Sequence, residues 1–274
     1  MTDPIATHAP KDSGVPAFAR DFSVEGRVVI VTGAGQGIGR ELARQFAAAG
    51  AVTVVADLNA ENAGAVVAEI EAAGGRALAV AVDIASRESA DAMAATVKQA
   101  FGRIDALINN AGIFATLAKR PFDQIPQAEW DLVLKVNVTG IFNCVCAVAQ
   151  TMREQGHGRI VNLSSDSVHR GTVNYLHYVT SKAAVIGMTN SLARELGPHG
   201  VTVNAIRPGS VATEVERTHN PTAAIRQRNA ELQCIPRGMM PTDLVGLVLF
   251  LTTNAAAFIT GQTIACDGGY THSF

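Results

Sequence analysis

Residues 28–39 have the sequence VVIVTGAGQGIG, and residues 40–49, RELARQFAAA, follow them directly. The apolar, β-branched opening predicts a buried parallel strand, and the second segment predicts a helix that Gly50 ends. Glycine occupies every second position from 33 to 39 between the two. Such a turn lets the backbone approach a pyrophosphate, and the amides and dipole of the helix N-terminus hold the anion. The stretch therefore predicts the first βαβ unit of a dinucleotide-binding sheet.

An acidic residue stands where a bound ribose would be held. A second strand is expected at Ala51–Ala56, and Asp57 follows it, about 20 residues after the glycine turn. There the carboxylate can accept hydrogen bonds from both ribose hydroxyls, whereas a 2′-phosphate would meet like charge. No lysine or arginine at 34–36 or 58–59 offsets that charge, and Arg40 is the nearest cation. We therefore expect NAD rather than NADP; the alternative is that Asp57 merely caps the turn into the next helix.

Strands and helices alternate along the rest of the chain without a long linker. The further expected strands are Ala77–Val82, Ala106–Asn109, Arg159–Leu163, Val201–Ile206 and Thr263–Ala265. The expected helices are Ala60–Ala73, Ser86–Phe101, Pro126–Gln155, Tyr175–Leu196 and Thr242–Thr252. This alternation predicts an α/β, single-domain Rossmann fold, with a doubly wound, mostly parallel seven-stranded sheet and helices on both faces. We expect a flexible tail at 1–24, the catalytic domain at 25–274 and a substrate lid at about 210–240, with a helix of its own at Thr222–Leu232.

Composition argues against several classes of protein. The 274 residues are 48% hydrophobic and 17% charged, and the net charge of -2 offers no basic field for nucleic acid or a membrane. The longest apolar runs, such as 247–251, are too short to cross a bilayer, and the N-terminus has no signal-peptide pattern. The cysteines form no C-x-x-C motif and are expected as free thiols. We therefore expect a cytoplasmic protein with no metal site and with neither nucleic acid nor a membrane as partner.

Tyr178 and Lys182 stand four residues apart in the expected helix 175–196 and so share one of its faces. A tyrosine with its reference pKa of about 10 is a poor base, and lowering that pKa to about 7 needs roughly 4 kcal/mol. An ammonium group about 5 Å away supplies roughly 3 kcal/mol at an effective dielectric constant of about 20. The pair is therefore sufficient for proton transfer at an alcohol or carbonyl oxygen. Tyr175 is the rival tyrosine, but Val179 stands four residues after it, so no lysine supports it.

Polar residues follow three other expected strands. Asp83 follows the third strand, where it can reach the cofactor or cap the next helix. Asn110 belongs to an NNAG motif after the fourth strand, where small residues permit close approach of the backbone to a ligand. Ser165 follows the fifth strand, where its hydroxyl could hydrogen-bond a substrate oxygen. Spacing alone does not separate Ser165 from Ser164 or Ser167.

Together these motifs closely resemble the short-chain dehydrogenase/reductase family, over about residues 25–270. They follow the family's order: TGAGQGIG at 32–39, Asp83, NNAG at 109–112, Asn137 in KVNVTG, Ser165 in NLSS, YVTSK at 178–182, Pro208-Gly209 and FITGQTIACDGG at 258–269. The resemblance implies that Tyr178 is the acid/base, and that Lys182 holds the ribose and lowers the pKa of the tyrosine. It also implies that Ser165 orients the substrate oxygen and that Asn137 takes part in a water-linked proton relay.

The resemblance further implies a nicotinamide cofactor held by the glycine turn and the strand ends. The expected contacts are Gly33, Gly35, Gln36, Gly37, Ile38, Gly39, Asp57, Leu58, Asp83, Ile84, Asn110, Ala111, Gly112, Tyr178, Lys182, Pro208, Gly209, Val211 and Thr213. Two departures from the family pattern, Arg207 in place of a frequent asparagine and Cys266 in place of a usual valine, remove no catalytic group.

The chain is therefore expected to be an NAD-dependent oxidoreductase that moves hydride between nicotinamide and a secondary alcohol or ketone. The alternative is an NADPH-dependent 3-oxoacyl-thioester (acyl-carrier-protein) reductase, against which Asp57 argues and for which Arg40 leaves room. A redox-sensing binding protein or a structural subunit is disfavoured because Tyr178 and Lys182 are both present.

No motif encodes the substrate. The lid and the segment 166–177 should line its pocket, and the candidates there are His169, Tyr175, His177, Thr213 and Met239, with Ile113 and Phe114 behind the NNAG turn. The apolar residues of the lid favour a compact, partly apolar alcohol or ketone. The lid also contains four basic residues that could hold an anionic group, namely Arg217, His219, Arg226 and Arg228.

The resemblance also implies a homotetramer. The two long expected helices carry apolar residues that we expect on more than one face, and a helix apolar all round needs a second partner. The residues concerned are Val136, Ile141, Val145 and Val148 in the first helix and Val185, Met188 and Leu192 in the second.

Overall fold

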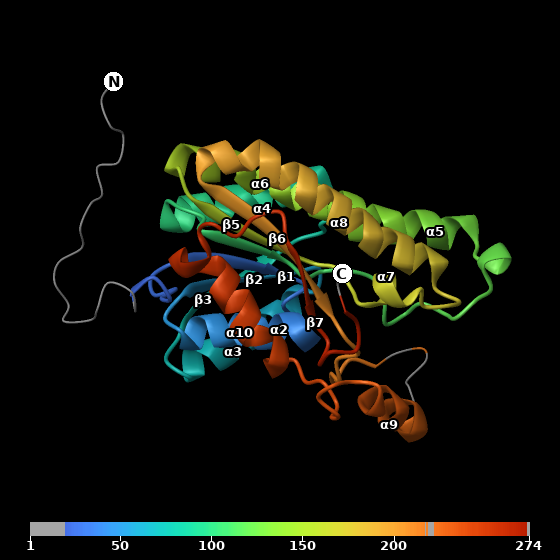
Figure 1. The fold of residues 1–274 in the computed structure, drawn as a ribbon. Coiled ribbons are helices and arrows are strands. Elements are labelled where there is room, and N and C mark those ends of the chain that lie inside the picture. The colour runs from blue at the N-terminus through green and yellow to red at the C-terminus, as the bar shows by residue number, and fades with distance from the viewer. Residues whose placement is uncertain (1–19, 217, 219–221, 273–274) are drawn as a thin grey trace.

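Seven parallel strands form one sheet at the centre of the molecule (Figure 1). The structure is a computed structural model that describes residues 20–216, 218 and 222–272. The strands are β1 Val28–Thr32, β2 Val52–Asp57, β3 Arg76–Ala81, β4 Ala106–Asn109, β5 Gly158–Leu163, β6 Val201–Pro208 and β7 Thr263–Cys266. Their order is β3-β2-β1-β4-β5-β6-β7, and every neighbouring pair is parallel. The predicted fold class is confirmed.

Helices cover both faces of the sheet. Helices α2 Gly37–Ala48, α3 Ala60–Ala72 and α10 Thr242–Thr252 lie on one face, and α4 Arg87–Phe101, α6 Gly140–Gln155 and α8 Leu176–Leu196 lie on the other (Figure 1). The shorter helices are α5 Gln127–Leu134, α7 Ser167–Arg170 and α9 Ala223–Glu231, with 3-10 turns at Phe122–Gln124, Gly197–His199 and Asn254–Ala256. Side chains of β1 alternate between the two faces: Val29 and Val31 join the core beneath α2, while Val28 and Ile30 join the core beneath α4 and α6.

The strand order changes direction at β1, because the chain runs outward from β1 to β3 and then returns to β4 on the other side of β1. Ligands of such sheets bind outside the carboxyl ends of the strands at this reversal. The glycine turn after β1, the NNAG motif after β4 and the serines after β5 all lie at this edge. The fold therefore brings together motifs that are more than a hundred residues apart.

Element boundaries agree with the predicted ones to within two residues, except that α2 begins at Gly37, three residues before the predicted start at Arg40, and that one long helix is divided. The expected helix 126–155 is divided into α5, a π-helix at Lys135–Thr139, and α6. A π-turn inserts one extra residue into the helical ladder and often marks a functional site. Asn137 lies in this turn and is fully buried.

The helical stretch Gln127–Gln155 is long and apolar enough to cross a membrane, with a mean hydropathy of 1.8 over its best window. This corrects the expectation that every apolar segment is too short for that. Half of that window is buried, and Ile141, Val145 and Val148 belong to the core between α6 and the sheet. The helix is thus accounted for by its packing on the sheet.

Residues 1–19 of the predicted tail, and residues 217 and 219–221 of the predicted lid, lie outside the described residues. The described part of the lid contains α9, close to the predicted helix at 222–232.

Candidate active site

The turn between β1 and α2 is shaped by close backbone contacts that leave no room for side chains. Gly33 has a φ of +63°, and a Cβ atom there would stand 2.8 Å from the Cα atom of Ala111. A Cβ atom at Gly39 would collide with the carbonyl oxygen of Gly33. Gln36 is the N-cap residue of α2, yet its side chain makes no capping hydrogen bond. The turn is therefore a backbone cradle of the kind that receives a phosphate, while Ile38 packs into the core beneath it.

Asp57 ends β2 beside this cradle. Its Oδ2 accepts a hydrogen bond from the amide of Gly35 at 2.8 Å, and its Oδ1 accepts one from the amide of Asn59 at 2.9 Å. Asn59 is the N-cap of α3, because its own side chain accepts a hydrogen bond from the amide of Asn62. A carboxylate has further lone pairs for ribose hydroxyls, so Asp57 can still hold a ribose. Leu58 is 75% exposed at the rim.

Arg40, the cation that left room for NADP, is bound to two carboxylates. Glu69 of α3 accepts hydrogen bonds from Arg40 Nε at 3.1 Å and Nη2 at 2.8 Å, and these raise the pKa of the guanidinium. Glu214 of the lid lies 3.6 Å from Arg40 Nη1. Glu214 also accepts a hydrogen bond of 2.9 Å from the amide of Gly37, at the start of α2. Sequence analysis missed Glu214, for which the available signal was its place beside Thr213.

Asn110 ties the glycine turn to β4. Its Nδ2 donates hydrogen bonds to the carbonyl oxygens of Thr32 at 2.9 Å and Gly33 at 3.0 Å. The Thr32 hydroxyl accepts hydrogen bonds from the amides of Asn110 and Ala111, both at 3.2 Å. The Asn110 side chain therefore supports the cradle, and Thr32 is a second supporting residue that the sequence analysis did not name.

Asn137 connects the NNAG motif to helix α8. Its Oδ1 accepts a hydrogen bond from the amide of Ile113 at 2.7 Å, and its Nδ2 donates to the Ser181 hydroxyl at 3.1 Å. A Cβ atom at Gly112 would stand 3.0 Å from Asn137 Oδ1 and 3.6 Å from Lys182 Nζ. The π-turn therefore places Asn137 beside the lysine that the sequence predicted as catalytic.

Lys182 and Tyr178 lie on the same face of α8, as predicted. Lys182 Nζ is 5.8 Å from the centroid of the Tyr178 ring and donates a hydrogen bond of 2.8 Å to the Leu163 carbonyl at the end of β5. Burial lowers the pKa of Lys182 to about 8, so the ammonium form still predominates at neutral pH. A cation therefore stands beside the tyrosine ring, as the electrostatic argument for a lowered tyrosine pKa requires.

Three serines follow β5, and their hydrogen bonds distinguish them. The Ser164 hydroxyl donates to the Lys182 carbonyl at 2.8 Å and so faces α8. The Ser167 hydroxyl is buried without a hydrogen-bond partner in the described part of the chain. The Ser165 hydroxyl accepts a hydrogen bond from the Ser167 amide at 3.2 Å, which leaves its own hydrogen to donate to a substrate oxygen. The geometry favours Ser165.

Two predicted cofactor contacts have other roles in this structure. Asp83 is exposed beyond the end of β3, and its Oδ1 accepts a hydrogen bond from the amide of Ala85 at 2.9 Å. The side chain of Ile84 is buried in the core, and its carbonyl oxygen accepts a hydrogen bond from Asn143 Nδ2. Ile84 can therefore offer a cofactor only its amide.

The lid begins where β6 ends at Pro208. The Gly209 amide donates to the Cys266 carbonyl at 3.0 Å, and Val211 is buried and forms a β-bridge with Met239. Thr213 is half-buried and lies near Gly37, since a Cβ atom on that glycine would be 3.8 Å from Thr213 Cγ2. The lid therefore runs from the end of β6 toward the glycine turn.

Aromatic rings stand beside Tyr178. The Phe114 ring is 4.7 Å from the Tyr178 ring and 5.5 Å from the Tyr175 ring, measured between centroids. Tyr175, the rival tyrosine, is buried with Leu117 in a small apolar cluster. His177 is fully buried, and its Nε2 lies 3.1 Å from Glu129 Oε1. His177 is therefore not a residue of the pocket wall, contrary to its place among the candidates, because it faces α5.

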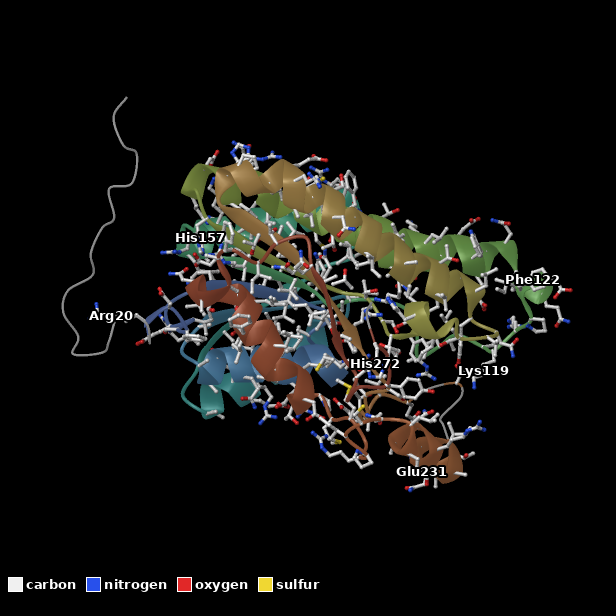
Figure 2. All side chains as sticks on the ribbon, viewed as in Figure 1. Arg20, Lys119, Phe122, His157, Glu231 and His272 are labelled. Atoms are coloured by element: carbon white, nitrogen blue, oxygen red, sulfur yellow. The ribbon has the colours of Figure 1, made fainter. Side chains whose placement is uncertain are left out.

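His157 lies away from this cluster. Figure 2 shows His157 at the opposite end of the sheet from the lid helix α9, and there burial and neighbouring arginines lower the pKa of His157 to about 4. Within residues 20–216, 218 and 222–272, no group of three or more His, Cys, Asp or Glu side chains could hold a metal ion.

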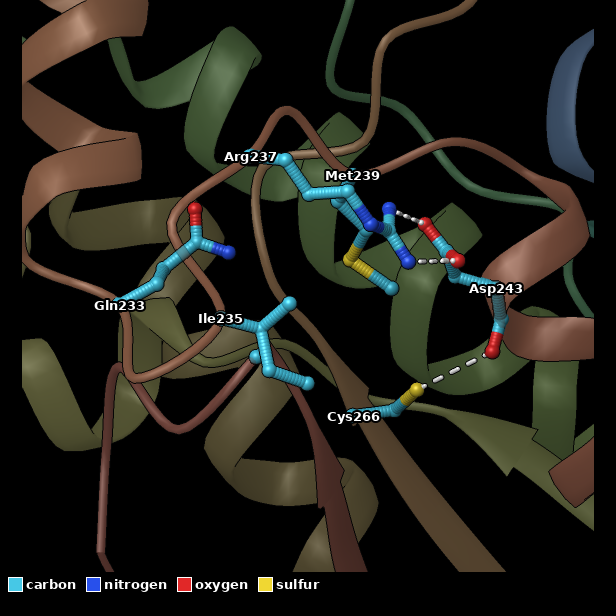
Figure 3. A pocket seen from close by; sticks show the side chains of 7 residues that line it. Gln233, Ile235, Arg237, Met239, Asp243 and Cys266 are labelled. Carbon is cyan, nitrogen blue, oxygen red and sulfur yellow. Dashed lines mark hydrogen bonds and ion pairs between the residues drawn. The ribbon is translucent and has the colours of Figure 1, made fainter.

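A hollow of about 160 Å³ lies between the end of the lid, α10 and β7 (Figure 3). Its lining residues are Gln233, Ile235, Arg237, Met239, Asp243, Cys266 and Gly268. Arg237 donates two hydrogen bonds of 2.7 Å to Asp243 and lowers the pKa of that carboxyl to about 2. The Cys266 thiol donates to the Asp243 carbonyl. None of the predicted catalytic side chains lines this hollow.

Comparison of this chain with known proteins identifies its family. A family model described as enoyl-(acyl carrier protein) reductase matches residues 33–271. The short-chain reductase protein NovJ of Streptomyces niveus is 41% identical over 247 residues, which cover 88% of this chain and 93% of that protein. A 3-oxoacyl-(acyl-carrier-protein) reductase of Synechocystis is 42% identical over 250 residues, which cover 89% of this chain and 96% of that protein.

A solved structure shows the same fold. The crystallised 7α-hydroxysteroid dehydrogenase in complex with NADH and 7-oxo glycochenodeoxycholic acid is 34% identical, with a TM-score of 0.85, and the match covers 92% of this chain and 96% of that one. The residues that the family model matches include the glycine cradle, the Asn137 π-turn and the Tyr178–Lys182 pair. The chain belongs to the short-chain dehydrogenase/reductase family.

Proposed function

We propose that this enzyme, an oxidoreductase that transfers hydride between a nicotinamide cofactor and a secondary alcohol or ketone, uses NAD in preference to NADP. The observation that carries the proposal is the pairing of Arg40 with Glu69 and Glu214 next to the carboxylate of Asp57. A 2′-phosphate at Asp57 would meet like charge, and the nearest cation is already neutralised by two acids. Among the relatives, the 7α-hydroxysteroid dehydrogenase structure contains NADH, which supports the same preference.

The residues present fit such a cofactor. The cradle at Gly33 and Gly39 admits no Cβ atom, so backbone amides are the groups that meet the pyrophosphate. Asp57 stands at the end of β2 for the ribose of the adenosine half, and Lys182 stands beside Gly112 for the ribose of the nicotinamide half. When bound, nicotinamide supplies the hydride acceptor or donor at its C4 atom.

The chain's own groups handle the proton. Ser165 donates its free hydroxyl hydrogen to the substrate oxygen and so fixes the reacting carbon. Tyr178 takes the proton from an alcohol, or gives it to a ketone, at that same oxygen. The ammonium of Lys182, 5.8 Å from the Tyr178 ring centroid, stabilises the tyrosinate form. Asn137 holds the NNAG backbone and α8 together, and the family resemblance implies that it takes part in a water-linked proton relay.

The substrate we propose is a compact, partly apolar alcohol or ketone. Phe114 and Tyr175 form an aromatic wall beside Tyr178, with Leu117 and Val133 behind it. A 3-oxoacyl thioester remains the second candidate, because one relative with 42% identity is a reductase of that class. The exposed Arg228 of α9 is a cation that an acyl carrier could contact.

We also propose a cytoplasmic homotetramer with neither nucleic acid nor a membrane as partner. The apolar residues first offered for the second helix face need correction, since Ile141, Val145, Val148 and Val185 all lie in the core. The outward apolar residues are instead Leu132, Phe142 and Leu176, each about half exposed along the α5–α6 and α8 pair. Light scattering at micromolar concentration tests this proposal, and a clean monomer would contradict it.

The test of the cofactor proposal is kcat/KM for NAD and NADP with one substrate, in the wild type and in Asp57→Ala. We expect the wild type to favour NAD and the variant to gain in relative use of NADP by at least about tenfold, the order that a unit like charge a few ångströms away implies. Asp91→Ala, which removes an exposed carboxylate paired with Arg87, is the matched control. Equal or better use of NADP by the wild type would refute the assignment.

A further inference from the structure

A lid carboxylate is bound at the N-terminus of α2. Glu214 Oε1 accepts the hydrogen bond of the Gly37 amide at 2.9 Å, and Gly37 is the first residue of that helix. The first turn of α2, all of whose residues are described, contains no acidic side chain, and the N-cap Gln36 makes no side-chain capping bond. Glu214 therefore supplies the anionic acceptor that this positive end of the helix favours.

Further contacts hold Glu214 in place. Arg40 Nη1, on the same helix, lies 3.6 Å from its Oε1. Desolvation acts to raise the pKa of Glu214, but the Gly37 hydrogen bond and the charge of Arg40 outweigh it and lower the pKa below its ordinary value. The group is therefore a full anion at neutral pH.

The lid backbone on both sides of Glu214 is also anchored. The Ala212 amide donates to the Met239 carbonyl at 2.8 Å, and the Thr218 amide donates to the Ala115 carbonyl at 2.8 Å. A Cβ atom at Gly37 would stand 3.1 Å from Val215 Cγ2, so the lid rests directly on the glycine turn. Residues 211–216 therefore lie against the cradle, and Thr218 reaches the loop beyond the NNAG motif.

The same cradle is where a dinucleotide pyrophosphate is held. The Gly37 amide has one hydrogen, and two anionic groups a few ångströms apart repel each other. We propose that Glu214 competes with the cofactor pyrophosphate for the N-terminus of α2 and so sets the affinity and the release rate of the cofactor. The lid residues 211–216 then shift when the cofactor binds. The inference rests on the proposed cofactor site, and it shares the pairing of Arg40 with Glu214 with the proposed preference for NAD.

The test compares Glu214→Gln and Glu214→Ala with the wild type by fluorescence titration of NADH and NADPH and by competition with ADP-ribose. We expect the Kd of all three to fall by about two- to fivefold, the range of a helix-terminal anion, with slower dissociation of NADH in stopped flow. NADH and ADP-ribose, which carry the pyrophosphate and no 2′-phosphate, should gain alike, and NADPH should gain at least as much because the substitution also removes a carboxylate from Arg40. A gain confined to NADPH would report on Arg40 and the proposed cofactor preference, and it would overturn the competition for the pyrophosphate.

Three controls make the result specific. Glu216→Gln removes an exposed lid carboxylate two residues away and should leave every Kd unchanged. Glu69→Gln frees Arg40 from its other partner without touching Gly37, and should give a smaller effect than Glu214→Gln. Adenosine, which has no phosphate, should bind wild type and variants equally and also reports that the site is folded. An unchanged or higher Kd in both Glu214 variants, an equal gain in either control variant, or an equal gain for adenosine would overturn the proposal.

Discussion

The cofactor half of the cleft and the lid half differ in what holds them in place. In the cofactor half, strand ends and the glycine turn are joined by backbone-directed hydrogen bonds, such as those of Asn110 to Thr32 and Gly33. In the lid, α9 is exposed on most of its residues, and the anchors lie on either side of it: the Val211–Met239 bridge, Glu214 and Thr218 before the helix, and Ile235 on Gly268 and Arg237 on Asp243 after it. Close backbone contacts in the cofactor half restrict which residues can occupy it. The lid half is held by contacts that many different loop sequences could make.

We expect the cofactor half to determine the chemistry of the reaction and the lid half to determine the substrate specificity. The acid/base pair lies on the buried face of α8 beside the end of β5, and the cradle follows the buried strand β1. The residues that we propose to contact the substrate come from the lid and from the loop that carries Phe114. Substitutions in the two halves should therefore produce different kinds of defect.

The largest expected effect belongs to Tyr178→Phe in the cofactor half. The variant removes the hydroxyl that moves the proton and keeps the ring against Phe114. We expect kcat to fall by about 10²–10⁴, the usual contribution of a general acid/base, while the Kd of the cofactor stays nearly unchanged. Steady-state kinetics and cofactor titration measure both quantities. A variant that keeps more than about a tenth of kcat would show that another group moves the proton.

Adding one methyl group to a glycine in each half tests the comparison directly. Gly39→Ala places a Cβ atom against the Gly33 carbonyl and 2.5 Å from Asn110 Nδ2, whereas a Cβ atom at Gly238 meets nothing within 4 Å. We expect Gly39→Ala to lower the free energy of unfolding by about 1–3 kcal/mol, as overpacking does, and to weaken cofactor binding at least tenfold. Thermal unfolding and titration provide the readouts. Gly238→Ala should change neither the free energy of unfolding nor the affinity for the cofactor. An equal loss of stability and affinity in the two variants would contradict the difference between the two halves.

The buried ammonium of Lys182 predicts a pH dependence of stability. Burial lowers its pKa from 10.5 to about 8, so between these values the unfolded chain binds more protons and folding stability rises with pH. Lys182→Met removes this rise, and the stability of the wild type relative to the variant should increase by about 1–3 kcal/mol from pH 8 to 10.5. Denaturant unfolding at several pH values checks it. A constant difference across this range would mean that burial does not perturb the lysine.

The sequence predicts the cofactor half of the cleft better than the lid half. The glycine turn, Asp57 and the Tyr178–Lys182 spacing were predictable because each is a local pattern with one physical purpose. The division of helix 126–155 was not, since a π-turn leaves no signature in apolar periodicity, and Asn137 came from family resemblance alone.

Side-chain contacts between residues far apart in the sequence could not be predicted either. Glu214 bonds a residue 177 positions away, and His177 faces Glu129 rather than the pocket. The neighbours of an exposed loop residue depend on how the loop folds back, which no local pattern encodes.

The smallest expected effect is in the substrate half, at Phe114. Its ring packs on Tyr178 and Tyr175, so Phe114→Ala opens the aromatic wall without touching the cradle. Aromatic pairs are worth about 0.5–1.5 kcal/mol beyond their buried area, so KM for a compact ketone should rise about two- to tenfold. The kcat/KM ratio should shift toward bulkier ketones, and the Kd of the cofactor should stay unchanged.

Phe122→Ala is the matched control for this variant, because Phe122 is 74% exposed in the 3-10 turn that precedes α5. It should leave KM, the substrate ratio and the cofactor Kd as they are in the wild type. If Phe114→Ala instead weakened cofactor binding as much as substrate binding, the aromatic wall formed by Phe114 and Tyr175 would belong to the cofactor half of the cleft. The loop after the NNAG motif would then position the nicotinamide side of the cleft, and the boundary between chemistry and specificity would lie farther into the lid.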